Sequence, residues 1–161
     1  MNKRNLIIAV GVIALATAWY AFRPELLFLD TTVSEEFPGG VQIASIEKDP
    51  MSITKGNFQS LAHETKGMAS IYQWADGKRR LRLTNFETSN GPDVHVYLTA
   101  AKVEKGSDAI KEAGFIDLGS MKGNKGDQNY DIPADVNLNK YKHVAIWCAR
   151  FGVNFGQAPL S

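Results

Sequence analysis

The sequence predicts an all-β domain, an antiparallel β-sandwich, preceded by one N-terminal transmembrane helix. From residue 53 onward, apolar and polar residues alternate with a period of two, and turns rich in Gly, Pro, Asn and Asp interrupt the alternation. Short strands at regular spacing, with little helix between them, are typical of a β-sandwich. A charge-free apolar run over residues 6–22 predicts the helix. We therefore expect a membrane segment (1–24), a linker and lead-in (25–53) and the sandwich domain (54–161).

The apolar run is about 25 Å long as a helix, near the lower limit for crossing a bilayer. Lys3 and Arg4 precede it, and Trp19 and Tyr20 lie at its far end, where amphipathic rings favour the membrane interface. Pro24 then ends the helix. Because basic flanking residues stay on the cytoplasmic side, we expect a single-pass cell-membrane protein whose C-terminal domain is extracytoplasmic.

A cleaved signal peptide is the alternative for this segment. Residues 16–18 (Ala-Thr-Ala) fit a small-x-small cleavage site, with the cut after Ala18. Retention is favoured because the apolar run continues past that site through Phe22. Both alternatives export the domain and differ only in whether it stays tethered.

Charge and cysteine content exclude several function classes. Lys3, Arg4 and Arg23 flank the membrane segment; subtracting these three from 18 basic residues leaves 15, against 17 acidic residues that all lie beyond it. The body is therefore near −2, which argues against nucleic acid as a partner. Cys148 is the single cysteine, so one chain can form no disulfide, no Cys-x-x-Cys pair and no multi-thiolate metal site.

The first half of the body predicts strands joined by tight turns. Asp76-Gly77 is a strong hairpin signal between a strand at 67–74 and its return at 79–86. A second turn at 90–93 (Asn-Gly-Pro-Asp) precedes alternating Val and Leu residues over 94–98.

The second half begins with the one stretch of the body that could be helical, 105–114. A strand at 115–119 and a Gly-rich loop at 122–127 follow, and 135–139 is expected as a turn. The longest strand is predicted over 143–153. Its residues up to Cys148 are apolar on both faces, which indicates a central strand and a buried cysteine.

Cys148 is the leading candidate for chemistry. A buried thiol usually acts as a small, inert hydrophobe, whereas a free cysteine in an exported protein is also a candidate redox or ligand group. The histidines are dispersed, and the residues after Cys148 lack the His and Met that a blue-copper site requires, so no metal site is predicted. Non-covalent haem needs only one or two axial ligands, and four residues are candidates for binding such a cofactor: His63, Met68, His95 and Met121.

Three further patterns favour structural roles. Residues 127–131 imitate the start of a calcium loop, but Ile132 replaces its glycine, so a turn is expected instead. The basic cluster at 78–82 is expected to solvate a hairpin edge, with an anionic headgroup or polysaccharide as its alternative ligand. Asp93 and His95 lie two apart on one strand face, without a nearby nucleophilic serine that would complete a catalytic set.

Several sequence blocks occur together in a fixed order. They are His63-x3-Gly-x-Ala69, Leu81-x-Leu-x-Asn-Phe86, the run 90–98 (NGPDVHVYL), the stretch 118–130 with its KGNKGDQNY end, and Val144-x-Ile-Trp-Cys148 with the Phe and Gly residues that follow to 156. Together they resemble the electron-transfer DM-thirteen domain, over roughly 54–160.

The resemblance implies a β-sandwich related to the DOMON domains and a layout similar to membrane-anchored bacterial members. It also implies extracytoplasmic redox chemistry in which Cys148 is the redox residue, with a partner protein or bound cofactor. A non-catalytic binding module for haem, sugar or a partner protein is the alternative function.

Overall fold

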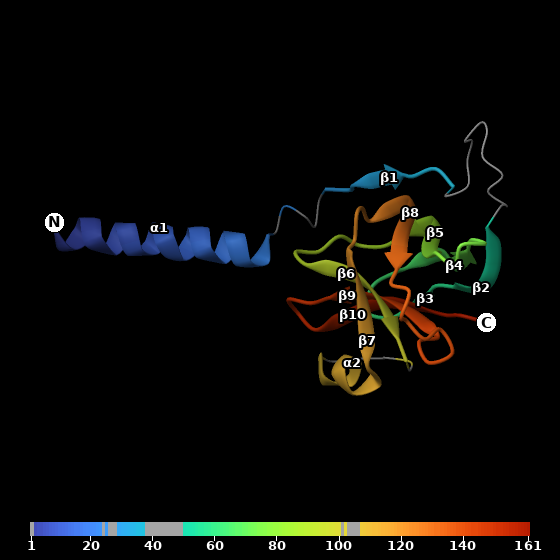
Figure 1. The fold of residues 1–161 in the computed structure, drawn as a ribbon. Coiled ribbons are helices and arrows are strands. Elements are labelled where there is room, and N and C mark those ends of the chain that lie inside the picture. Colours follow the sequence, from blue (N-terminus) through green and yellow to red (C-terminus); the bar gives the residue numbers. More distant parts are fainter. Residues whose placement is uncertain (1, 24, 26–28, 38–49, 101, 103–106) are drawn as a thin grey trace.

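The computed structural model describes residues 2–23, 25, 29–37, 50–100, 102 and 107–161. It consists of a two-sheet β-sandwich and one long helix, α1, which extends away from one end of the sandwich (Figure 1). The predicted fold class is therefore confirmed.

Helix α1 (Lys3–Phe22) is apolar around its whole circumference from Leu6 onward, and none of its residues is buried. It is apolar enough and long enough to cross a membrane; a signal sequence would have the same properties. The helix ends at Arg23, which is in the left-handed region and donates its backbone N–H to the Trp19 carbonyl at 2.8 Å.

The first sheet has the strand order β1-β8-β5-β4-β2 and the second β3-β10-β9-β6-β7. β1 and β8 pair in parallel, and the other pairs are antiparallel. A short helix, α2 (Ser107–Ala113), precedes β7. The strand bounds are β1 Thr32–Ser34, β2 Met51–Asn57, β3 Gln59–Ser60, β4 Lys66–Gln73, β5 Arg79–Glu87, β6 Val94–Thr99, β7 Phe115–Ser120, β8 Lys125–Ile132, β9 His143–Cys148 and β10 Val153–Pro159.

The core lies between the two sheets, where every second residue of the central strands points inward. Leu81 and Leu83 of β5 face Val96 of β6 and Ile146 of β9 within one apolar cluster, all completely buried. The alternation in the sequence predicted these inward faces correctly.

The prediction of one long strand over 143–153 was wrong. β9 ends at Cys148, and the chain reverses through the turn Ala149–Gly152 before β10 begins. The Gly152 N–H donates to the Cys148 carbonyl at 2.9 Å and closes this turn. Apolar residues lie on both sides of the turn, and Phe151 within the turn is apolar but exposed. The hydrophobic pattern therefore did not indicate a hairpin here.

The Gly-rich stretch 122–127 is only partly a loop, because β8 already begins at Lys125. Its glycines allow β1 to lie close: a Cβ atom on Gly126, whose φ is 95°, would come within 2.0 Å of the Val33 carbonyl oxygen. Thr32–Ser34, in the stretch predicted as linker and lead-in, therefore pairs with the first sheet of the sandwich.

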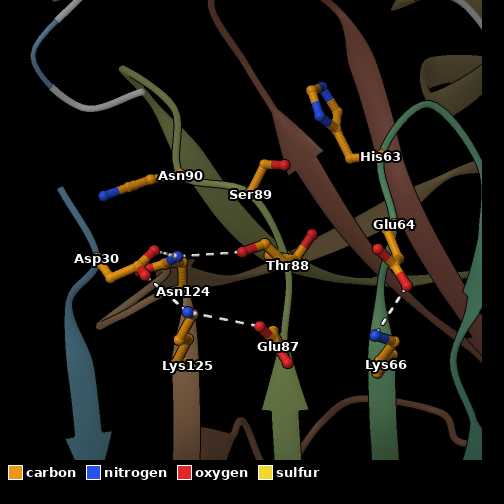
Figure 2. Close-up of a pocket in the computed structure, with 10 residues that line it drawn as sticks. All are labelled: Asp30, His63, Glu64, Lys66, Glu87, Thr88, Ser89, Asn90, Asn124 and Lys125. Atoms are coloured by element: carbon orange, nitrogen blue, oxygen red, sulfur yellow. Dashed lines mark hydrogen bonds and ion pairs between the residues drawn. The ribbon is translucent and has the colours of Figure 1, made fainter. Parts of the chain in front are cut away.

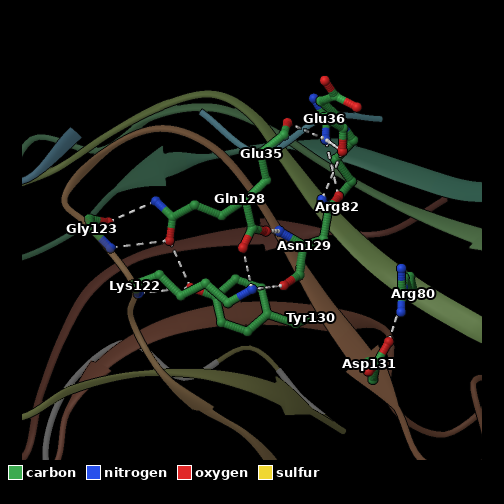
Figure 3. Close-up of polar contacts among 10 residues, drawn as sticks. All are labelled: Glu35, Glu36, Arg80, Arg82, Lys122, Gly123, Gln128, Asn129, Tyr130 and Asp131. Atoms are coloured by element: carbon green, nitrogen blue, oxygen red, sulfur yellow. Dashed lines mark hydrogen bonds and ion pairs between the residues drawn. The ribbon is translucent and has the colours of Figure 1, made fainter. Parts of the chain in front are cut away.

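Arg82 secures this N-terminal segment (Figure 3). Its side chain is only 8% exposed, pairs with Asp127 at 2.6 Å, and donates to the side chain of Asn129 and to the carbonyls of Glu35 and Glu36. The Glu35 carboxylate accepts from the Asn129 backbone at 2.6 Å. The expectation that the whole basic cluster 78–82 solvates a hairpin edge fails for Arg82, because its charge is neutralised inside the fold.

At the opposite edge of the first sheet, β2 meets the C-terminal residues of the chain. The backbone of Lys55 pairs with that of Ser161 in both directions, at 3.0 and 3.3 Å. Gly56 permits this approach, because a Cβ atom there would lie 1.8 Å from the Pro159 carbonyl oxygen. The contact ties the two sheets together along one side.

Candidate functional site

Cys148 is the last residue of β9, which lies between β10 and β6 in the middle of the second sheet. Its backbone is in register with Val94 on one side and Val153 on the other. The side chain is completely buried in the main apolar core. A thiol enclosed by apolar groups is shielded from reagents in the solvent. The predicted burial of this residue is confirmed.

The strand end that carries Cys148 lies beside two connecting segments. The Ala149 N–H, in the turn after the cysteine, donates to the Asp93 carbonyl at 2.8 Å, and the Met121 N–H donates to the Val94 carbonyl at 2.8 Å. This end of the sandwich is the one from which α1 extends (Figure 1).

His95 lies at the same end, held between two carboxylates. One ring nitrogen is 3.0 Å from Asp117 of β7 and the other 3.2 Å from Asp93. Burial of the ring opposes its charged form, but the hydrogen bonds and charges of Asp117 and Asp93 outweigh burial and raise the pKa of His95 above its ordinary value of 6.5. The sequence placed Asp93 and His95 on one strand face, but it missed Asp117, which reaches the ring only through the pairing of β6 with β7.

His63 lines a groove of about 280 Å³ beside β10 (Figure 2). Its ring contacts the ring of Phe155 with 3.9 Å between centroids, and burial lowers the pKa of His63 below 6.5. The other lining residues are polar or charged: Asp30, Glu64, Lys66, Glu87, Thr88, Ser89, Asn90, Asn124 and Lys125.

Ion pairs and one buried amide organise this groove. Lys125 pairs with Asp30 at 2.6 Å and with Glu87 at 3.5 Å. The side-chain amide of Asn124, almost completely buried, donates to Asp30 and to the Thr88 carbonyl. No sequence pattern marked Asp30 or Asn124 as part of a site, because the two residues come together only when β1 pairs with β8.

The four candidate axial ligands lie in different surroundings. His63 faces the polar groove, and Met68 is half-buried in a separate depression beside Gly67 and Asn85. Met121 packs against the main core, and both ring nitrogens of His95 contact carboxylates. These surroundings do not fit a haem, which requires an apolar slot and an imidazole or thioether free to bind its iron.

In the stretch 127–131, which resembles the start of a calcium loop, the first carboxylate is used for contacts within the fold. The Asp127 carboxylate accepts hydrogen bonds from Arg82 and from the Asn85 N–H at 2.8 Å. Across the part of the chain that the structure describes, no three His, Cys, Asp or Glu side chains are grouped so that they could hold a metal ion.

Comparison with known protein families gives a match over most of the sandwich. The model of a family described as electron transfer DM13 matches residues 57–160, a span that contains Cys148, His63 and His95. Neither a curated protein nor a solved structure matches the chain.

Proposed function

The chain belongs to the electron transfer DM13 family, and from this membership we infer that it is a membrane-anchored redox domain on the outer face of the cytoplasmic membrane. The family match is the observation that carries the redox role. The apolar helix α1 supports the anchor, and Lys3 and Arg4 before it support an extracytoplasmic domain.

Within this role, Cys148 is the proposed redox residue. It is the chain's single thiol, and it lies at the end of a central strand, directly before an exposed turn. Because its side chain is completely buried, a partner's disulfide cannot reach the sulfur while the fold is closed. We therefore propose that Cys148 exchanges electrons with a docked partner or a bound cofactor and does not form a stable mixed disulfide.

Redox titration of the purified full-length chain in detergent tests this role, with absorption spectra and thiol content recorded in the oxidised and reduced states. Cys148→Ser should abolish the redox signal, and it should cost roughly 1–3 kcal/mol of stability because a hydroxyl is left in an apolar site. Ala145→Ser is the matched control, since it places a hydroxyl at an equally buried position of the same strand. A redox signal retained by Cys148→Ser would contradict the redox role of Cys148. The lack of any reducible species in the wild-type protein would contradict it as well.

The anchor and its orientation are tested separately. Protease added to intact spheroplasts should digest the sandwich domain, and the full chain should remain in the membrane fraction. A soluble product that begins at Trp19 would show that the segment is a signal peptide cleaved after Ala18.

The groove beside His63 favours a second function, a non-catalytic binding module of the cell envelope. Its polar lining suits a small hydrophilic ligand such as a sugar. Calorimetric titration with neutral and acidic saccharides tests this function. Saturable binding that Asn90→Ala weakens and Cys148→Ser leaves intact would support the binding module over the redox role.

A further inference from the structure

The end of α1 is in direct contact with the turn that follows Cys148. The guanidinium group of Arg150 donates to the Ala21 carbonyl at 2.6 Å and to the Tyr20 carbonyl at 3.3 Å. The last carbonyls of a helix have no partner within the helix and carry partial negative charge, so a cation is stabilised there. Arg150 thus joins the sandwich to the C-terminal end of α1.

An aromatic pair forms a second contact at the same place. The rings of Phe22, the last residue of α1, and Phe151 lie nearly parallel, with 6.0 Å between their centroids. Both side chains nevertheless remain at least half exposed, at 61% and 50%. The pair therefore presents an apolar surface that the residues described by the structure leave uncovered.

The length of α1 sets the depth of this surface. Its 20 residues span about 30 Å, the thickness of the hydrocarbon core of a bilayer. When α1 crosses the membrane, Phe22 lies at the outer boundary of the core, and Trp19 and Tyr20 lie in the zone that amphipathic rings prefer. Phe151 stacks on Phe22 and must lie at a similar depth.

We propose that the turn Ala149–Gly152 docks in the headgroup layer of the bilayer, with Phe151 against the acyl boundary and Arg150 among the lipid phosphates. Anionic headgroups attract such a cation, and aromatic rings are stabilised at this depth. The proposal rests on the membrane anchor of the proposed function. It deepens that function, because docking holds the Cys148 end of the sandwich against the membrane and directs it toward a redox partner located in or on the bilayer.

A fluorescence measurement on the full-length chain tests the docking. The protein is reconstituted into vesicles of phosphatidylethanolamine and phosphatidylglycerol, and an environment-sensitive maleimide dye is attached at Ala149→Cys. Ala75→Cys is the matched control: it is also an exposed turn position, but it lies in the turn between β4 and β5, and these two strands meet at the end of the sandwich away from α1 (Figure 1). The unsubstituted chain gives the background labelling of Cys148.

The dye at position 149 should show blue-shifted emission and strong quenching by lipids that carry a nitroxide at the headgroup, and the dye at position 75 should show neither. Adding Phe151→Glu should remove the quenching at position 149. Two results would contradict the docking but not the membrane anchor. One is equal quenching at the two positions in protein that co-floats with the vesicles, and the other is quenching at position 149 that persists after Phe151→Glu. Protein that does not co-float would overturn the anchor, and the docking with it.

Discussion

Removing the buried guanidinium of Arg82 should destabilise the sandwich much more than removing an exposed one two residues away on the same strand. Arg82→Met keeps the apolar stem of the side chain but leaves Asp127 without its cation and the Glu35 and Glu36 carbonyls without a donor. Breaking a buried ion pair costs about 3–5 kcal/mol. Because Asp127 is 28% exposed and keeps its bond from the Asn85 N–H, we expect the lower end of that range.

Arg80→Met is the matched control. Arg80 pairs with Asp131, but the two side chains are 44% and 78% exposed, and exposed pairs contribute about 0–1 kcal/mol. Urea unfolding of the full-length chain in mild detergent, followed by tryptophan fluorescence, measures both losses. Equal losses in the two variants, or a loss below about 1 kcal/mol for Arg82→Met, would refute the assignment of Arg82 as a buried anchor.

Three further outcomes are expected. Gly56→Ala should lower the melting temperature markedly, because its Cβ atom would collide with the Pro159 carbonyl, whereas Ser52→Ala on the same strand should change stability by less than about 0.5 kcal/mol. Titration by NMR should give a pKa above 6.5 for His95 and below 6.5 for His63; the reverse order would contradict the packing of the two rings. Since the folded-state pKa of His95 is raised, its contribution to stability is complete below pH 6.5 and is lost as the pH rises through that raised value. The stability difference between wild type and His95→Gln should therefore be largest in mildly acidic buffer, and a difference that grows toward alkaline pH would exclude this origin.

Local chemistry made most of the sandwich predictable from its sequence. Alternation placed Leu81 and Leu83 inward, and Asp76-Gly77 marked the hairpin between β4 and β5. Alternation failed at the β9–β10 hairpin, because Ala149 and Phe151 continue the apolar pattern into the turn and Gly152 is its main sign of a reversal. It also failed at β1, a strand of three residues, which is too short to show any period.

The surroundings of the candidate residues were less predictable than their burial. Two apolar faces on β9 sufficed to predict that Cys148 is enclosed. The contact of His95 with Asp117 depends on how β6 pairs with β7, and the contacts of Arg82 depend on a segment nearly fifty residues earlier in the chain. Pairings of this kind leave no spacing signal in one sequence, because they arise only when the sheets form.

The pairing of β1 with β8 determines how the domain would respond to mechanical load on its tether. α1 and β1 run in roughly the same direction (Figure 1), so a pull from the membrane draws β1 lengthwise along β8. The backbone bonds at either end of β1, from Lys125 to the Thr31 carbonyl and from Glu35 to the Asp127 carbonyl, then carry the force together with Arg82. Loaded in shear, these bonds must yield simultaneously instead of opening one after another. In the membrane-anchored form proposed above, the short β1 strand would thereby help the sandwich stay closed under load.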